Sequence, residues 1–144
     1  MSELYLISPP NIELDTFSDS LKAALTTGHV SAFQLRLKEA DEPAIRRAIE
    51  TCMPICHAHA VPFILNDSLA LAIEYGCDGV HLGQEDLEHY RLGDGISGSE
   101  KIADIKSQLG ESQILGITCH ASKHLAMEAA EAGADYVAFG AFYS

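Results

Sequence analysis

The sequence has few basic residues and no long apolar segment. Nine Lys and Arg stand against 21 Asp and Glu among 144 residues, which gives a formal charge of −12 at pH 7. A surface that follows a nucleic-acid backbone needs a broad basic face, so this balance argues against nucleic-acid binding. No run of about 18 apolar residues occurs, and no basic segment precedes the short apolar run at the amino terminus. We therefore expect a cytoplasmic protein with no membrane partner.

The sequence also lacks the cysteine spacing of a secreted disulfide framework, so its four cysteines are expected to be reduced thiols. The segment 52–59 nevertheless places two cysteines and two histidines within eight residues, which suggests a metal site. Structural zinc sites usually draw ligand pairs from two separate elements, whereas this segment is predicted to be one helix. Buried thiols at a helix end are therefore favoured over zinc.

Short apolar runs alternate with helical patterns along the chain, which is typical of a parallel sheet covered by helices. The expected strands are Leu4–Ser8, Ala32–Leu37, Val61–Asn66, Gly79–Leu82, Ile114–Cys119 and Tyr136–Gly140. The expected helices are Asp19–Gly28, Asp41–Ala58, Ser68–Tyr75, Ser99–Leu109 and Ser122–Ala132. A hydrophobic content of 47% and the absence of linker-like segments predict a single domain over residues 1–144.

This pattern of elements leaves two architectures open. One is an open, doubly wound sheet with helices on both faces. The other is a (β/α)8 barrel without its last two units, because a closed barrel typically needs about 200 residues or more.

Polar side chains gather where the second, third and fourth expected strands end. Gln34, Arg36 and Lys38 alternate with leucines, so the two-residue period of a strand places all three on one face. Asp67 and Asp86 follow the next two strands. Carboxyl ends of parallel strands meet at one edge, so two cations beside two carboxylates predict a phosphate and magnesium site.

These residues, and two others near strand ends, Thr118 and His81, also have structural interpretations. The three polar residues on the second strand could form a solvated face, although barrel interiors rarely accept unpaired polar groups. Asp67 could cap the third helix and Asp86 a short turn, which is a common use of aspartate and compatible with metal binding. Thr118 could be a β-branched residue that packs in the fifth strand. We interpret His81 as a structural histidine that makes hydrogen bonds.

Five segments spread along the chain carry motifs in a fixed order. They are Gln34-Leu35-Arg36-Leu37-Lys38, Asn66-Asp67, Asp78 through Asp86, Gly116-Ile117-Thr118 and Gly133 through Gly140. Together they resemble the ThiE/TenI family of thiamine phosphate synthases. The family's motifs that correspond to the first four segments are Gln-Leu-Arg-Glu-Lys, Asn-Asp-Arg, Asp-Gly-Val-His-Leu-Gly-Gln-x-Asp and Gly-Val-Ser. The fifth segment is similar to the family's sixth strand.

The resemblance implies a TIM (β/α)8 barrel of which this chain holds about six strands and five helices. It covers essentially all of residues 1–144 in order. The family continues after its sixth strand with thiazole-binding segments and two more strands, so we expect a barrel domain truncated at its carboxyl terminus. Leu37 stands where the family has an acidic residue, and the strand alternation predicts that its side chain faces the helices.

The resemblance also implies an enzyme of thiamine biosynthesis. Such a transferase couples hydroxymethylpyrimidine pyrophosphate to thiazole phosphate through a Mg²⁺-assisted dissociative displacement and releases pyrophosphate. Arg36 and Lys38 would be catalytic, and Asp67 and Asp86 would bind the metal. The substrate-binding residues would be Gln34, Leu35, Arg36, Leu37, Lys38, Asn66 and Thr118. The partners would be these small molecules, and a homo-oligomer is compatible with the resemblance.

Two other functions remain open at this stage. A TenI-like thiazole tautomerase shares the barrel but carries out acid/base chemistry without a pyrophosphate-bound magnesium ion. A noncatalytic partial barrel would bind the pyrimidine pyrophosphate without turnover, and activity of the 144-residue chain on its own is doubtful. Retention of both cations and both carboxylates favours the synthase.

Overall fold

The computed structural model describes residues 4–83, 86–87, 90, 98–119 and 123–138. Its strands are β1 (Leu4–Ile7), β2 (Val30–Leu35), β3 (Phe63–Asn66), β4 (Gly79–Leu82), β5 (Ile114–Thr118) and β6 (Tyr136–Ala138). Its helices are α1 (Leu14–Thr26), α2 (Glu42–Ala58), α3 (Leu69–Tyr75), α5 (Gly98–Gln108) and α6 (Lys123–Ala132). These strands and helices alternate along the chain.

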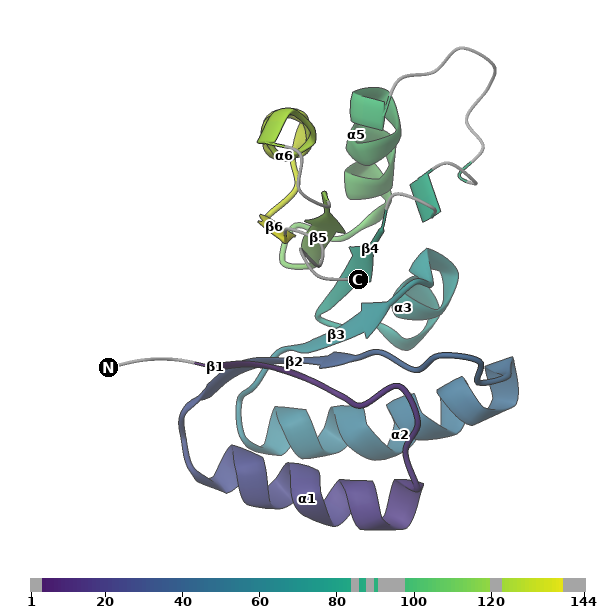
Figure 1. Cartoon of the computed structure of the whole chain (residues 1–144), viewed down its shortest axis with the longest axis vertical. Helices are drawn as coiled ribbons and strands as arrows, with labels where there is room; N and C mark the ends of the chain where they lie inside the picture. The colour runs from purple at the N-terminus through teal and green to yellow at the C-terminus, as the bar shows by residue number, and fades with distance from the viewer. Residues whose placement is uncertain (1–3, 84–85, 88–89, 91–97, 120–122, 139–144) are drawn as a thin grey trace.

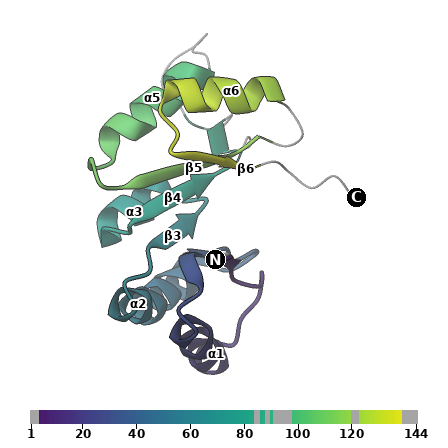
Figure 2. The same cartoon turned by 90° about the vertical axis from the view of Figure 1, so that its left-hand side faces the viewer.

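All six strands are parallel and lie in sequence order, from β1 at one edge of the sheet to β6 at the other. Figures 1 and 2 show the sheet curving, with the helices outside the curve: α1 and α2 near β1 and β2, and α5 and α6 near β5 and β6. A doubly wound sheet would reverse its strand order at a switch point and carry helices on both faces. The described chain is therefore the larger part of a (β/α) barrel wall, as the resemblance implied.

The hydrophobic core fills the space between the outer face of the sheet and the helices. Phe33 and Leu35 of β2 pair with Phe63 and Leu65 of β3, and the side chains of all four are buried. The same cluster includes Leu21 and Leu25 of α1 and Ile49 of α2. Full burial of each such side chain contributes roughly 2 kcal/mol to stability, so the helices are held on the outside by this apolar face.

Local signals in the sequence explain where the helices begin. Glu13 caps α1 by accepting a hydrogen bond from the backbone N–H of Thr16 at 2.7 Å. Asp41 caps α2 in the same way through Ala44 at 2.9 Å, with Pro43 in the first turn, where its missing N–H costs nothing. The predicted start of the first helix at Asp19 was therefore late, because the glutamate cap and the half-buried Leu14 lie upstream of it.

The strands agree with the expected ones except at their ends. β2 runs over Val30–Leu35 instead of Ala32–Leu37, because its pairing with β1 begins at Val30 and its pairing with β3 ends at Leu35. β3 begins at Phe63, two residues later than expected. The described part of β6 ends at Ala138, and the two remaining residues of that expected strand lie outside the described residues, as do residues 120–122 before α6.

The cysteines and histidines of segment 52–59 lie on different sides of α2. Cys52 and Cys56 are fully buried, and burial raises the thiol pKa of Cys52 to about 11 and that of Cys56 to about 12. His57 is exposed and bonds Asp78 Oδ2 through Nε2 at 2.7 Å. All four cysteines of the chain are free thiols. The described residues contain no group of three potential metal ligands among His, Cys, Asp and Glu, and no helix long and apolar enough to cross a bilayer.

Gly79 provides a test of the packing inside the curve of the sheet. An added Cβ would lie 2.6 Å from the backbone oxygen of Ile114 and 2.8 Å from Ile64 Cδ1. We expect Gly79→Ala to lower the free energy of unfolding by about 2 kcal/mol, measured by urea denaturation, because a backbone neighbour cannot move aside cheaply. Gly110→Ala is the control, since its Cβ would make ordinary contacts, 3.4 Å or more from Gln113. Equal effects of the two changes would contradict this packing.

Candidate functional site

The inner face of the sheet carries a cavity of about 610 Å³ at the carboxyl ends of the strands. It is lined by Tyr5, Ile7, Gln34, Arg36, Lys38, Asn66, Asp67, His81, Gly83, Asp86, Thr118, Tyr136, Val137 and Ala138. Seven of the nine residues predicted to form the site are therefore brought together. Leu35 is buried in the core, and Leu37 lines a separate, smaller cavity beside α1 and α2, so neither side chain lines the site.

Arg36 and Lys38 reach the cavity although β2 ends at Leu35. The backbone N–H of Arg36 donates to Ser8 Oγ at 2.8 Å, and that hydroxyl donates to the carbonyl of Arg36 at 3.2 Å. The backbone N–H of Lys38 donates to the carbonyl of Pro10 at 2.9 Å. Ser8 and Pro10, which follow β1, thus hold the backbone of residues 36–38 as a neighbouring strand would. The expected alternation of side chains therefore continues past the end of β2.

Asp67 stands where β3 turns into α3. Its backbone N–H donates to the carbonyl of His81 at 2.9 Å, and its φ of +71° lies in the left-handed region, which aspartate tolerates better than most residues. The helix cap is Ser68, whose Oγ accepts from the N–H of Leu71 at 3.2 Å. The alternative that Asp67 caps the third helix is therefore wrong.

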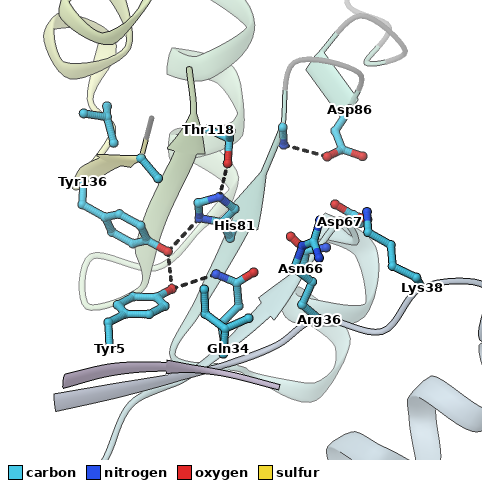
Figure 3. A pocket seen from close by; sticks show the side chains of 14 residues that line it. Tyr5, Gln34, Arg36, Lys38, Asn66, Asp67, His81, Asp86, Thr118 and Tyr136 are labelled. Atoms are coloured by element: carbon cyan, nitrogen blue, oxygen red, sulfur yellow. Dashed lines mark hydrogen bonds between the residues drawn. The ribbon is translucent and has the colours of Figure 1, made fainter. Parts of the chain in front are cut away.

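Asp86 lines the cavity from the segment after β4. Its Oδ2 accepts a hydrogen bond from the backbone N–H of Gly83 at 2.7 Å, so it does stabilise a turn, as the structural interpretation expected. A carboxylate has two oxygens and about four acceptor positions, so a role in the turn and a role in the cavity are compatible. Figure 3 shows Asp86 and Asp67 on the same side of the cavity, together with Lys38, Arg36 and Asn66.

The other side of the cavity is a hydrogen-bonded group of uncharged side chains (Figure 3). His81 bonds Tyr136 Oη through Nδ1 at 2.8 Å and Thr118 Oγ1 through Nε2 at 2.6 Å. Tyr136 Oη lies 2.5 Å from Tyr5 Oη, which accepts from Gln34 Nε2 at 3.1 Å. These hydrogen bonds join β1 to β6, the two edge strands of the described sheet. They confirm that His81 makes hydrogen bonds.

Tyr5 and Tyr136 are cavity residues that sequence reasoning missed. The predicted site residues were charged, amide and hydroxyl groups near the carboxyl ends of strands, whereas Tyr5 lies in the middle of β1 and Tyr136 at the start of β6. The period of the strand could have found Tyr5, which shares a face with Ile7, and Tyr136, which shares one with Ala138. Gly116 also indicates that a large side chain packs against β5, because an added Cβ there would lie 2.0 Å from the Cζ atom of Tyr136.

Burial decides the charge state of this uncharged side. The pKa of His81 is lowered from 6.5 to about 4: desolvation is the main cause, the carboxylate of Asp67 opposes it, and the positive charge of Arg36 adds to it. Desolvation and the contact with Tyr5 raise the pKa of Tyr136. At neutral pH the imidazole and the phenol are therefore both uncharged. The cavity thus has one neutral side and one side with two cations and two carboxylates.

The chain is similar to thiamine-phosphate synthases along nearly its whole length. The model of a family described as thiamine monophosphate synthase matches residues 4–144. The thiamine-phosphate synthase of Rhodospirillum centenum is 49% identical over 97% of the chain, and that of Erythrobacter litoralis is 49% identical over 99%. The chain spans 61% of the length of each of these relatives.

A solved structure has the same fold. The thiamine phosphate pyrophosphorylase from Pyrococcus furiosus superposes on 98% of this chain and 61% of its own length, with a TM-score of 0.71 and 24% sequence identity. At this identity the likeness establishes the architecture alone, and it agrees with the sequential parallel strands of the sheet.

The lowered pKa of His81 predicts an acid-sensitive fold. Between about pH 6.5 and pH 4 the unfolded chain binds a proton at this residue that the folded chain excludes, so the stability present above pH 6.5 falls as the pH is lowered through this window. The loss attributable to His81 should reach about 3 kcal/mol near pH 4. We expect His81→Gln to show a correspondingly flatter pH dependence of unfolding in urea. Identical slopes for the two proteins would contradict a buried neutral imidazole.

Proposed function

The chain belongs to the thiamine monophosphate synthase family, and from this premise we propose that it carries the pyrimidine and pyrophosphate part of a thiamine phosphate synthase. The enzyme joins hydroxymethylpyrimidine pyrophosphate to thiazole phosphate, forms thiamine phosphate and releases pyrophosphate. The relatives carry the name of this activity over a longer chain, so the activity is proposed for the natural gene product as a whole.

One observation carries the proposal: two cations and two carboxylates line one cavity of a chain whose overall charge is −12. Arg36 and Lys38 are two of only nine basic residues, and both reach the same cavity as Asp67 and Asp86. An acidic protein that binds a phosphorylated molecule needs such a local concentration of cations, or a metal ion, to offset its own field. A pyrophosphate group fits this side of the cavity.

The donor set fits a magnesium ion held by Asp67 and Asp86. Magnesium is usually bound through one or two protein carboxylates, and phosphate oxygens and water complete its coordination. Asp67 is available for this because Ser68 caps α3, and Asp86 lines the same cavity. When bound, the ion would neutralise negative charge on the pyrophosphate oxygens.

Arg36 and Lys38 would stabilise the pyrophosphate as it leaves. Departure of this group gives it additional negative charge and leaves a pyrimidinylmethyl cation, so catalysis depends on preorganised cations and on alignment of the thiazole nitrogen. Gln34, Asn66 and Thr118 would bind the pyrimidine and pyrophosphate through their amide and hydroxyl groups. Because the side chains of Leu35 and Leu37 face away from the cavity, these two residues would contact substrate only through their backbone.

The test uses the natural gene product with the pyrimidine pyrophosphate and thiazole phosphate. We expect equimolar thiamine phosphate and pyrophosphate, and loss of both products when the metal is removed with EDTA. Isomerisation of a thiazole without pyrophosphate release would identify a tautomerase instead. Binding of the pyrimidine pyrophosphate without turnover would identify a ligand-binding protein. Either result would overturn the proposal.

Charge-removing substitutions test the roles of individual residues. We expect Asp67→Asn and Lys38→Met each to lower kcat by about 100-fold or more, because each removes a preorganised charge at the leaving group. The matched controls are Asp19→Asn and Lys22→Met, which change exposed residues of α1 outside the cavity. Raised magnesium should partly restore Asp67→Asn and leave Lys38→Met unchanged. Losses of the same size in the controls would contradict the assignment.

A further inference from the structure

The uncharged side of the cavity contains an unbroken series of four hydrogen bonds. Gln34 Nε2 contacts Tyr5 Oη at 3.1 Å, and that phenol contacts Tyr136 Oη at 2.5 Å. Tyr136 Oη contacts His81 Nδ1 at 2.8 Å, and His81 Nε2 contacts Thr118 Oγ1 at 2.6 Å. Figure 3 shows the series running along one wall of the cavity, from the strand that begins the sheet to the end of β5.

The number of hydrogens restricts how these bonds can point. The amide of Gln34, the two phenols, the neutral imidazole and the threonine hydroxyl each supply one hydrogen to the series, whereas it contains four links. One hydrogen is therefore left over. If His81 carries its hydrogen on Nε2, each earlier group must donate to the next, and the spare hydrogen belongs to Thr118. If His81 carries it on Nδ1, the spare hydrogen belongs to a tyrosine.

The chemistry of the groups favours the first arrangement. A phenol is a stronger hydrogen-bond donor than acceptor, because its oxygen lone pair is delocalised into the ring, whereas the unprotonated nitrogen of an imidazole is a strong acceptor. Tyr136 therefore donates to Nδ1. The stacking of the His81 and Tyr136 rings, with centroids 5.5 Å apart, and the lack of space above Gly116 hold this pair in place. Nε2–H then donates to the hydroxyl oxygen of Thr118, a better acceptor than a phenol.

We propose that His81, Tyr136, Tyr5 and Gln34 are positioning residues that hold Thr118 as an obligate hydrogen-bond donor toward the cavity. With its oxygen accepting from His81, the hydroxyl of Thr118 directs its own hydrogen at the bound molecule. The ligand group that it recognises is an acceptor atom without a hydrogen, such as an unprotonated ring nitrogen. In the proposed function, on which this last identification rests, Thr118 would bind a ring nitrogen of the aminopyrimidine and reject its amino group.

The ring nitrogen of His81 that carries the hydrogen decides directly whether Thr118 donates toward the cavity. In the protein labelled with ¹⁵N-histidine, we expect the ring nitrogens of His81, assigned by comparison with His81→Gln, to show the Nε2–H tautomer at neutral pH. Tyr136→Phe should move the Nδ1 resonance, because that nitrogen loses its donor. Tyr75→Phe is the matched control: its hydroxyl accepts from Arg46 at the outer surface, and it should leave both resonances unchanged. The Nδ1–H tautomer would overturn the inference.

Kinetics test the consequence for the substrate. We expect Thr118→Val to lower kcat/KM about tenfold and Tyr136→Phe about threefold, as for loss or misdirection of one hydrogen bond. In the Thr118→Val background, Tyr136→Phe should have no further effect, because it acts through the missing hydroxyl. Independent, multiplicative effects would overturn the positioning role.

The two experiments separate this inference from the proposed function. A protein with the Nε2–H tautomer that makes no thiamine phosphate would overturn the function and uphold the hydrogen-bond arrangement. An active synthase with the Nδ1–H tautomer would overturn the inference alone.

Discussion

Parallel pairing of the six strands in sequence order is the constraint on which the rest of the structure depends. Each strand runs in the same direction, so all of their carboxyl ends meet at one edge of the curved sheet. The helices return the chain along the outer face, where the apolar cluster holds them. Residues as far apart in the chain as Arg36 and Asp86 therefore line one cavity. A different strand order would keep the same motifs but disperse them.

The cavity is divided between charged and uncharged groups for physical reasons. Arg36, Lys38, Asp67 and Asp86 come from segments beyond the strand ends, where solvent reduces the cost of carrying charge. His81 lies within β4 and is buried, so desolvation keeps it neutral, and its two ring nitrogens are occupied by hydroxyl groups. One half of the cavity therefore has the charges that the proposed function requires for a pyrophosphate, and the other half is uncharged.

The alternation of elements was predictable because each element has its own local signal. Apolar runs predicted all six strands, and β2 is as long as the expected strand but lies two residues earlier, because its pairing with β1 and β3 sets its ends. The alternation of Gln34, Arg36 and Lys38 toward one face was also predictable, although Ser8 and Pro10, not a longer strand, maintain it. Tyr5 and Tyr136 were not predictable as partners, because their contact depends on how strongly the sheet curves between its two edges.

The sequence by itself determined the order of strands and helices, the face on which the polar residues lie and the family to which the chain belongs. These follow from short-range periodicity and from motifs that can be read residue by residue. The motifs also implied the barrel, which the pattern of elements alone had left open against a doubly wound sheet. Only the tertiary structure decided that Ser68 and not Asp67 caps α3, and that His81 joins Tyr136 to Thr118. Those features depend on the distances between segments that the chain brings together only when the sheet curves.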